Sequence, residues 1–336
     1  MNNIKLIFLC FPFFGYSQVT PLPDYNFELA LVNLGFDNLV DGFVLNSRID
    51  TIDSLVVPSC NIESLIGIDA FLSLTYLDCS SNNIDTLDLT NNYLKYLDCS
   101  ANQLVEIDVS NHLNLQTFKC SFNKFVQIDV SLNTSLIYFE CFENRLVSLD
   151  ISNNIFLREL WCNNNNLTNL DIAGIDMYVL ICDDNQLTSI NNLSDNISLQ
   201  HLSCSENNIS SLNLSTHTQL NWLSCSKNQL FQLDISALFA LNYFFAWDNP
   251  NLNCIAVNNV SFANANWLLW DGQLGNIDGH HYFSTNCILS STFQINQNKQ
   301  ISSVINLKGQ QSLIFKNKPL FYKYNDGSYE YKIIIE

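Results

Sequence analysis

The chain has 336 residues, and its 32 Asp and Glu against 14 Lys and Arg give a formal net charge of −18. This acid excess argues against binding to nucleic acid or to an anionic membrane surface, because affinity for phosphate needs clustered Lys and Arg. Apolar residues make up 47% of the chain, with only 10 Gly and 6 Pro, so neither a disordered nor a collagen-like chain fits. We therefore expect a folded protein.

Residues 1–17 have the features of an export signal. Lys5 precedes the apolar stretch 6–14, and the small residues Gly15 and Ser17 occupy the −3 and −1 positions before Gln18. A membrane anchor is the less favoured alternative, because the run is far shorter than the ~18–20 residues that span a bilayer. The sequence predicts a signal peptide cleaved after Ser17, no membrane insertion, and a protein that is secreted or on the outer cell surface.

A repeat of 20–22 residues dominates residues 52–254, which contain about ten units. Most units share the core pattern Leu/Phe-x-Cys-x-x-Asn-x-Leu/Ile/Phe, as in Leu97 to Leu104. The first unit is degenerate, and the last has Ala246 in place of the cysteine. Because one such unit cannot bury its own apolar face, we expect the units to stack on one another.

The pattern resembles the leucine-rich repeat, with cysteine replacing its third leucine. The resemblance implies an α/β repeat solenoid, a horseshoe of parallel short strands in which Leu and Cys point inward and the residues between them outward. We expect the column asparagines, Asn82 to Asn249, to satisfy backbone groups where each strand turns away. A shortened unit at 174–177 and a lengthened one at 191–196 leave the local geometry there open.

The chain has 12 cysteines, which in an exported protein would suggest disulfides. Those of the repeat lie in one column on strands ~4.8 Å apart, a poor placement for disulfides. Without a Cys-x-x-Cys pair, a metal site is also disfavoured. Cys10 belongs to the signal peptide and Cys60 to a repeat position, so we predict a disulfide between the remaining Cys254 and Cys287.

Caps are expected at both ends of the array, at 18–51 and 255–287. Asp24 is predicted to begin a helix with Phe27, Leu31 and Leu34 on one face, and Gly35 to end it. The segments 23–30, 249–255 and 283–287 resemble exported leucine-rich-repeat proteins of the Bacteroidetes, in which such arrays are secreted or surface proteins.

Residues 288–336 form a separate tail with 3 acidic and 6 basic residues, whereas 18–287 hold 29 and 7. Its segments 301–307, 320–324 and 329–335 are predicted strands of a small β domain. The turn at 306–310 and the ending at 331–336 resemble C-terminal sorting domains of the type IX secretion system, although the usual Tyr-Pro-Asn-Pro opening is missing. The resemblance implies recognition by export machinery, and a plain β-cap is the alternative.

Outward strand positions place aromatic side chains on the concave face of the expected horseshoe. Exposed aromatics are typical of binding surfaces, because they bury much area at little entropic cost. The alternative is that they form ladders that only stabilise the sheet. The candidate binding residues are Tyr76, Tyr96, Tyr138, Trp161, His201, Trp222, Tyr243 and Trp247.

An acidic column lies in the second half of the units. Asp-x-Ser sequences organise turns, and calcium bridging of the stacked carboxylates is the alternative. The column comprises Asp88, Asp108, Asp129, Asp150, Asp171 and Asp234.

No phosphate-binding or hydrolase motif occurs, and His280 and His281 are expected to be exposed. We therefore predict a non-enzymatic protein with no cofactor and no metal. It is predicted to bind a protein or glycan on a cell or host surface through its concave face. The alternatives are a structural cell-surface module and, third, an accessory domain of a surface hydrolase.

Overall fold

The structure is a computed structural model that describes residues 19–90, 93–269 and 275–287, and the backbone of three strands between 301 and 333. The chain divides into two compact units, Met1–Cys287 and Ile288–Glu336. The predicted signal peptide with its cleavage after Ser17, and the predicted turns of the tail, lie outside the described residues. Within the described ranges, no helix is long and apolar enough to cross a membrane.

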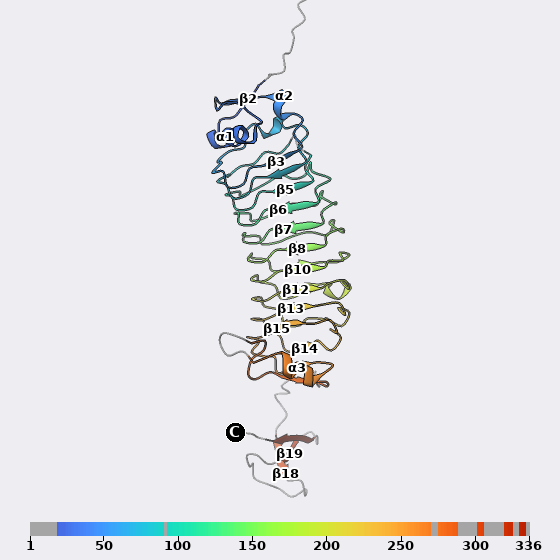
Figure 1. Cartoon of the computed structure of the whole chain (residues 1–336). Helices are drawn as coiled ribbons and strands as arrows, with labels where there is room; N and C mark the ends of the chain where they lie inside the picture. The colour runs from blue at the N-terminus through green and yellow to red at the C-terminus, as the bar shows by residue number, and fades with distance from the viewer. Residues whose placement is uncertain are drawn as a thin grey trace, which may run out of the picture. The chain divides into compact units, whose positions relative to one another are not determined.

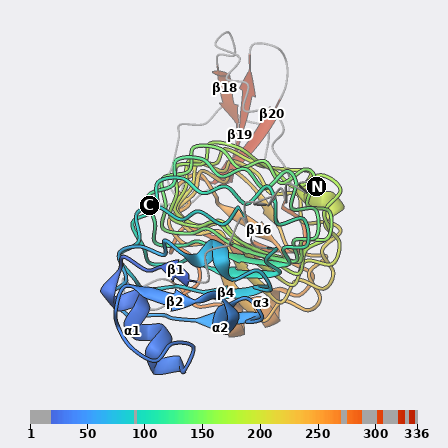
Figure 2. The same cartoon turned by 90° about the horizontal axis from the view of Figure 1, so that it is seen from above.

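A parallel sheet of ten strands runs the length of the first unit, one strand per repeat (Figure 1). Strand order follows chain order, and equivalent residues lie side by side, as Leu77 does beside Leu97. Seen along the stack, successive coils overlie one another (Figure 2). The predicted solenoid of short parallel strands is confirmed. The strands are β3 (Ser54–Val56), β4 (Tyr76–Asp78), β5 (Tyr96–Asp98), β6 (Thr117–Lys119), β7 (Tyr138–Glu140), β8 (Glu159–Trp161), β10 (Val179–Ile181), β12 (His201–Ser203), β13 (Trp222–Ser224) and β15 (Tyr243–Phe245).

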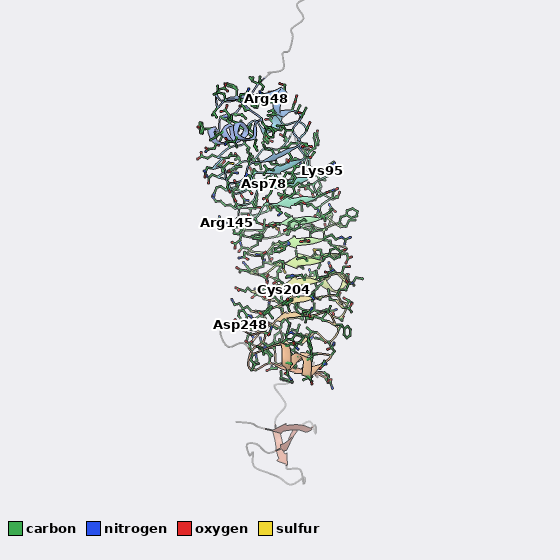
Figure 3. The ribbon with its side chains drawn as sticks, in the orientation of Figure 1. Arg48, Asp78, Lys95, Arg145, Cys204 and Asp248 are labelled. Atoms are coloured by element: carbon green, nitrogen blue, oxygen red, sulfur yellow. A yellow bond between two sulfur atoms is a disulfide. The ribbon has the colours of Figure 1, made fainter. Side chains whose placement is uncertain are left out.

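Columns of Leu, Ile, Phe and Cys, each contributed once per repeat, form the core. The eight cysteines of the repeat column are buried free thiols, and Cys204 is one of them (Figure 3). Burial raises the pKa of the Cys204 thiol well above its ordinary value, with smaller contributions from Cys225 and Asp183. These cysteines therefore act as small apolar residues, and the prediction that they form no disulfides is confirmed.

The column asparagines hold neighbouring coils together through backbone hydrogen bonds. The amide of Asn102 donates to the carbonyl oxygens of Cys79 and Cys99, both at 3.1 Å, and its Oδ1 accepts the N–H of Ile84 at 3.0 Å. The side chain is 4% exposed, so these bonds form away from water. The predicted role of this column in satisfying the turn is confirmed.

A second buried polar column, five residues before a strand, was not anticipated from the sequence. Asn154 donates to the carbonyl oxygens of Val130 at 3.1 Å and Asn133 at 2.9 Å, which joins its own coil to the preceding one. The column contains both asparagine and histidine, which made it harder to recognise, although its spacing of 21–42 residues was visible. Its members are His112, Asn133, Asn154, Asn196 and His217, all at most 1% exposed.

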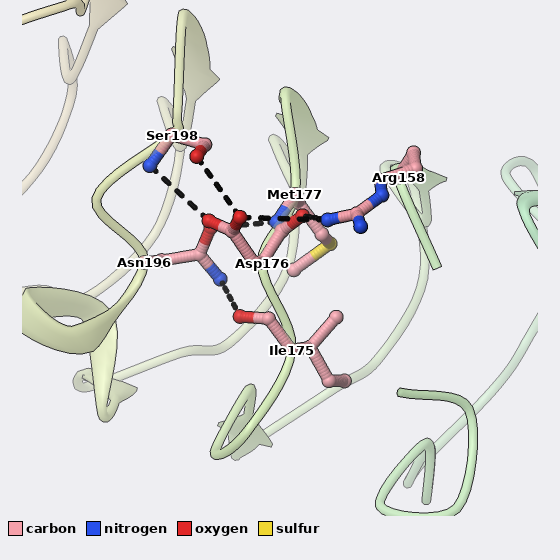
Figure 4. A network of polar contacts seen from close by, with 6 residues as sticks. All are labelled: Arg158, Ile175, Asp176, Met177, Asn196 and Ser198. Atoms are coloured by element: carbon pink, nitrogen blue, oxygen red, sulfur yellow. Dashed lines mark hydrogen bonds and ion pairs between the residues drawn. The ribbon is translucent and has the colours of Figure 1, made fainter. Parts of the chain in front are cut away.

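The two repeats of unequal length are joined by a polar network (Figure 4). Arg158 donates to the backbone oxygen of Asp176 and pairs with its carboxylate at 3.5 Å. The hydroxyl of Ser198 donates to the same carboxylate at 2.9 Å, and the amide of Asn196 donates to the carbonyl of Ile175 at 2.7 Å. These contacts keep β10 in register with both β8 and β12 despite the irregular lengths.

Helix α1 (Tyr25–Leu34) begins after Asp24, whose Oδ1 accepts from the N–H groups of Asn26 at 2.8 Å and Phe27 at 2.9 Å. It ends at Gly35, which has φ 80° and so adopts the left-handed conformation that glycine tolerates. Phe27 and Leu31 are buried as expected, whereas Leu34, the last helical residue, is 44% exposed. The predicted apolar face therefore covers only the first part of the helix.

Short elements complete this unit and its two ends. A disulfide joins Cys254 to Cys287 with a Cα–Cα distance of 5.8 Å, which confirms the predicted pair. Trp267 contacts the rings of Phe244 and Phe283 and covers the last coil. The remaining elements are β1 (Val19–Pro21), β2 (Phe43–Leu45), α2 (Asn46–Ile49), η1 (Ile68–Ala70), β9 (Leu170–Asp171), β11 (Ile190–Asn191), η2 (Leu193–Asp195), β14 (Leu233–Asp234), β16 (Cys254–Ala256), α3 (Val260–Asn266) and β17 (Tyr282–Ser284).

The second unit contains an antiparallel three-stranded sheet in the order β18 (Ile301–Ile305), β19 (Pro319–Tyr324) and β20 (Tyr329–Ile333). Each strand overlaps a segment predicted from the sequence.

Candidate functional site

The candidate site is the outward side of the ten-stranded sheet, called the concave face here. It consists of the first and third residues of each strand and the residue two positions further on. Because strand side chains alternate, these positions point away from the core. All eight aromatic and histidine candidates occupy such positions, Tyr76 in β4 through Trp247 after β15. The structure thus aligns them on one side of the solenoid.

The N-terminal part of this face combines tyrosines with carboxylates. The rings of Tyr76 and Tyr96 stack with centroids 4.0 Å apart and planes inclined by 6°. Asp78 and Asp98 lie opposite each other on the same pair of strands. Burial is the main cause that raises the pKa of Tyr96, followed by its hydrogen bond with Tyr76 and by the two carboxylates. The two neighbouring aspartates make this part of the face acidic.

A lysine, a tyrosine and a glutamate form a compact group in the middle of the face. The ammonium of Lys119 lies 5.2 Å from the ring centroid of Tyr138 and 3.8 Å from the carboxylate of Glu140. The Tyr138 hydroxyl donates to Glu140 at 2.8 Å. Burial, and then the bond to Glu140, raises the pKa of Tyr138, so its hydroxyl remains a donor at neutral pH.

Aromatic rings dominate the C-terminal part. The ring of Trp222 lies 5.1 Å from His201, 4.9 Å from Tyr243 and 5.6 Å from Phe245, measured between centroids. Burial lowers the pKa of His201, so the imidazole is neutral at pH 7. The contacts form the ladder considered as an alternative, yet Tyr243 is 53% exposed at its end. The geometry is thus compatible with a binding surface and with a ladder that only stabilises the sheet.

The two remaining tryptophan candidates are Trp161 in β8 and Trp247 after β15. Trp161 keeps its indole N–H buried without a hydrogen-bond partner. Lys227 lies 5.2 Å from the ring centroid of Trp247. On the same face, the carboxylate of Asp183 accepts the Ser203 hydroxyl at 2.7 Å, and burial raises its pKa above the ordinary value. The raised pKa reflects the cost of desolvating the charged form of this carboxyl group.

The acidic column of the repeats has the predicted turn-forming role. Asp88 Oδ1 accepts the backbone N–H of Thr90 at 3.0 Å and its hydroxyl at 2.6 Å, and these bonds lower the pKa of the carboxyl. In the described part of the chain, the one group of three potential metal ligands with close ligand atoms lies elsewhere, in the C-terminal cap. Calcium bridging therefore gains no support from the geometry.

That group in the cap consists of Asp278, His280 and His281. His281 is 5% exposed, so the expectation of an exposed histidine is wrong for this residue. Its Nδ1 accepts the backbone N–H of Asp278 at 3.2 Å, and its Nε2 lies 3.3 Å from the carbonyl of Asn249. Both ring nitrogens are thus occupied in joining the cap to the last repeat, which leaves neither for a metal.

A cavity of about 690 Å³ lies away from the concave face, between the turns of the first three repeats. Ile66, Leu87 and Ile107 contribute apolar surface to it, and carboxylates such as Asp88 line its edge. None of the residues that line the cavity belongs to the strand positions of the concave face. The cavity is therefore separate from the candidate site.

No family model and no curated protein matches the sequence. Among solved structures, the chain is similar to the internalin inlF of Listeria monocytogenes, with 21% identity over 70% of this chain and 84% of that one and a TM-score of 0.56. The internalin inlC2 of the same organism shares 18% identity over 72% of this chain and 98% of that one, with a TM-score of 0.52. A chain of the LRIM1/APL1C complex shares 20% identity over 64% of this chain and 45% of that one, with a TM-score of 0.54. The repeat geometry and these similarities together show that the chain has the leucine-rich-repeat fold.

Proposed function

We propose that the protein is a secreted or cell-surface binding protein that recognises a partner protein through its concave face. The observation that carries the proposal is the alignment of the eight candidate side chains on one outward face, where the cluster around Trp222 ends in the half-exposed Tyr243. Aromatic side chains are enriched among residues that dominate binding energy. The fold is also found in a structure of two proteins in complex, LRIM1/APL1C. A glycan is the second class of ligand.

Export is the other part of the proposal. Residues 1–17 would direct the chain into the secretory pathway, and the basic tail, 288–336, would address it to export machinery of the type IX kind. Deleting 299–336 tests the second step. Loss of the protein from the medium and cell surface is expected, and unchanged export would reduce the tail to a plain β-cap.

The binding role is tested by capture from whole-cell and host extracts. We compare the wild type with the triple variant Tyr138→Ala, Trp161→Ala, Trp222→Ala, which removes aromatic surface from the concave face. The matched control removes three rings outside the strands of the large sheet, Tyr93→Ala, Phe156→Ala, Phe231→Ala, which are 66%, 58% and 65% exposed. We expect the concave variant to lose its partner and the control to retain it.

Thermal unfolding of both variants separates binding from stability. If the rings form only a stabilising ladder, the concave variant will melt at a lower temperature and still capture the same proteins as the wild type. That result would favour the structural cell-surface module. Deglycosylated extracts run in parallel distinguish a protein from a glycan partner.

A further inference from the structure

The cavity of about 690 Å³ between the turns of the first three repeats is large enough for a small molecule. Pockets that bind such ligands measure about 300–1,000 Å³. A second cavity, of about 120 Å³, shares Ile107 and Asp108 with it and is also lined by Asp129 of the following repeat. Together the two cavities extend across adjacent repeats, which suits a chain-like molecule.

The larger cavity lies where two successive repeats differ in length. The sheet register pairs Leu55 with Leu77 and Leu77 with Leu97, so the first repeat has 22 residues and the second has 20. The longer repeat contains η1, which follows Gly67 with φ 103°. A Cβ on Gly67 would lie 2.7 Å from Cδ2 of Leu22, which shows that the N-terminal cap packs directly on this repeat. The wall of the cavity that contains Gly67 is therefore held in place by the cap.

Part of the lining is apolar surface that the next repeats bury. Leu87 and Ile107 are only partly buried, whereas Ile128 and Leu149, at the same position of the next two repeats, are 9% and 7% exposed. Ile66 in the lining is 61% exposed. An alkyl group that covers these side chains is removed from water together with them, and such burial is the main source of affinity for an apolar ligand.

The charged side chains of the lining are all acidic. In the described part of the chain, none of these carboxylates takes part in an ion pair. Hydrogen bonds from Thr90 lower the pKa of Asp88, and the charge of Asp108 partly opposes this shift, so the two carboxylates repel each other. The acidic residues of the lining are Asp69, Asp88, Glu106 and Asp108. The basic residues between positions 19 and 144 all lie outside the lining, and they are Arg48, Lys95, Lys119 and Lys124.

We propose that this cavity binds a small amphiphilic amine, with its alkyl chain over Leu87 and Ile107 and its ammonium group among the carboxylates. The ligand class follows from the two kinds of lining, because apolar surface binds the chain and unpaired carboxylates bind a positively charged N–H donor. A fatty acid is repelled by the same carboxylates. A quaternary ammonium group has no N–H to donate, and none of the described lining residues is aromatic, so the cavity offers it no cation–π contact.

The test measures binding of three probes to the full-length protein by isothermal titration calorimetry, at pH 7 and 150 mM salt with a chelator present. The probes are octylamine, butylamine and 1-octanol. We expect octylamine to bind about tenfold more tightly than either of the others, because butylamine lacks four methylene groups and octanol lacks the charge. Equal affinity for octylamine and butylamine would mean general attraction to an acidic protein. Equal affinity for octylamine and octanol would mean an apolar site only, and either result overturns the proposal.

A first pair of variants tests the apolar part of the site. Ile66→Ser removes exposed apolar surface from the cavity, and we expect it to weaken octylamine binding about fivefold or more. Ile155→Ser is the matched control, because Ile155 is the same residue type, is 52% exposed and lies outside the lining. It should bind like the wild type. Equal loss in both variants would place the amine elsewhere.

A second pair tests the charged part. Asp88→Asn, Asp108→Asn removes two charges, while each amide oxygen can still accept the hydrogen bond of its turn, so the fold should be retained. The control Asp150→Asn, Asp234→Asn removes the same charge from other repeats of the acidic column. Octylamine should bind the first variant about fivefold or more weakly and the control unchanged. An unchanged affinity in the first variant would contradict the role of the carboxylates.

The site lies outside the concave face, so this inference goes beyond the proposed function and is judged separately. The triple variant Tyr138→Ala, Trp161→Ala, Trp222→Ala should bind octylamine like the wild type. A loss there would place the amine on the concave face and overturn the proposal. Failure of every probe to bind would also overturn it, and would leave the capture experiment on the concave face unaffected.

Discussion

At the scale of single residues, one backbone conformation recurs in every repeat. The residue before each column asparagine has a positive φ, such as 53° at both Ala101 and Phe122. L-residues pay roughly 1–2 kcal/mol in this left-handed region, which suits glycine. The turn nevertheless persists, because each column asparagine, such as Asn102, is hydrogen-bonded to several backbone groups of its own coil and of the preceding one. The hydrogen bonds of the column asparagine thus hold the preceding residue in its strained conformation.

Replacing Ala101 with glycine should therefore stabilise the protein. We expect the free energy of unfolding to rise by about 0.5–1 kcal/mol, since relief of the left-handed penalty exceeds the extra entropy of glycine in the unfolded chain. Urea unfolding measures the change. Ala237→Gly is the control, because Ala237 is not among the positive-φ residues, and it should destabilise by a similar amount. An Ala101→Gly variant as unstable as the control would contradict the strain argument.

The buried column of asparagine and histidine predicts an acid-sensitive residue. His217 is fully buried, and burial lowers its pKa despite opposing hydrogen bonds to Leu193 and Leu214. The folded state keeps this imidazole neutral, while the unfolded state binds a proton below about pH 6.5. The unfolded state thus holds more protons, so stability falls as the pH falls below that value, by up to about 1.4 kcal/mol per pH unit.

His217→Asn installs the other residue that this column uses, as at Asn133 and Asn154. We expect the variant to lose less stability than the wild type between pH 7 and pH 5, measured by thermal unfolding at each pH. The reciprocal variant Asn154→His should become more acid-sensitive. Identical pH profiles for the wild type and both variants would show that this position does not titrate on unfolding.

At the scale of elements, one carboxylate both caps the N-terminal helix and binds the first repeat. Oδ1 of Asp24 caps α1, while its Oδ2 accepts the N–H groups of Glu63 at 2.7 Å and Ser64 at 2.8 Å in the first repeat. An ordinary cap contributes about 1 kcal/mol. Here the same side chain also binds two backbone N–H groups of the first repeat, so we expect it to contribute more to stability than an ordinary cap does.

Asp24→Ala should cost about 2 kcal/mol or more, because both sets of hydrogen bonds are lost. Asp24→Asn is a graded control, since its amide oxygen can still cap the helix while its NH₂ group cannot accept from the repeat. We expect an intermediate loss, read from urea unfolding. If Asn behaves as Ala does, the contacts to the first repeat contribute nothing beyond the cap.

At the scale of the whole molecule, stability is distributed along a stack in which each coil contacts its neighbours. Such arrays unfold from their ends unless these are closed. The C-terminal end is closed by the disulfide, by Trp267 over Phe244, and by His281 against the last repeat. Opening this cap should therefore affect the nearest coils first and leave the distant ones protected.

The double variant Cys254→Ser, Cys287→Ser should lose about 2–4 kcal/mol of local stability. Hydrogen exchange is expected to rise in residues 233–287 and to stay unchanged around β4 and β5. Cys60→Ser, at a half-buried free thiol in the first repeat, is the control and should exchange like the wild type. Uniformly faster exchange along the array would contradict a stack that opens from its end.

Much of this structure was predictable because the same residue pattern occurs in about ten successive repeats. The periodic Leu, Cys and Asn specify the strand, the core and the turn, and the pairing of Cys254 with Cys287 followed once the column cysteines were set aside. The buried His281 and the exposed Leu34 were less predictable, since both lie at the ends of the array, where no second copy of the pattern exists.

The candidate site, too, was predictable from the sequence only in part. The sequence by itself determined that aromatic side chains line one face, because strand side chains alternate with a period of two. Only the tertiary structure decided which of them touch, which carboxylates receive a base and which do not. Those properties depend on distances between side chains some 20 residues apart, as between Asp78 and Asp98, and on local burial that no single repeat encodes.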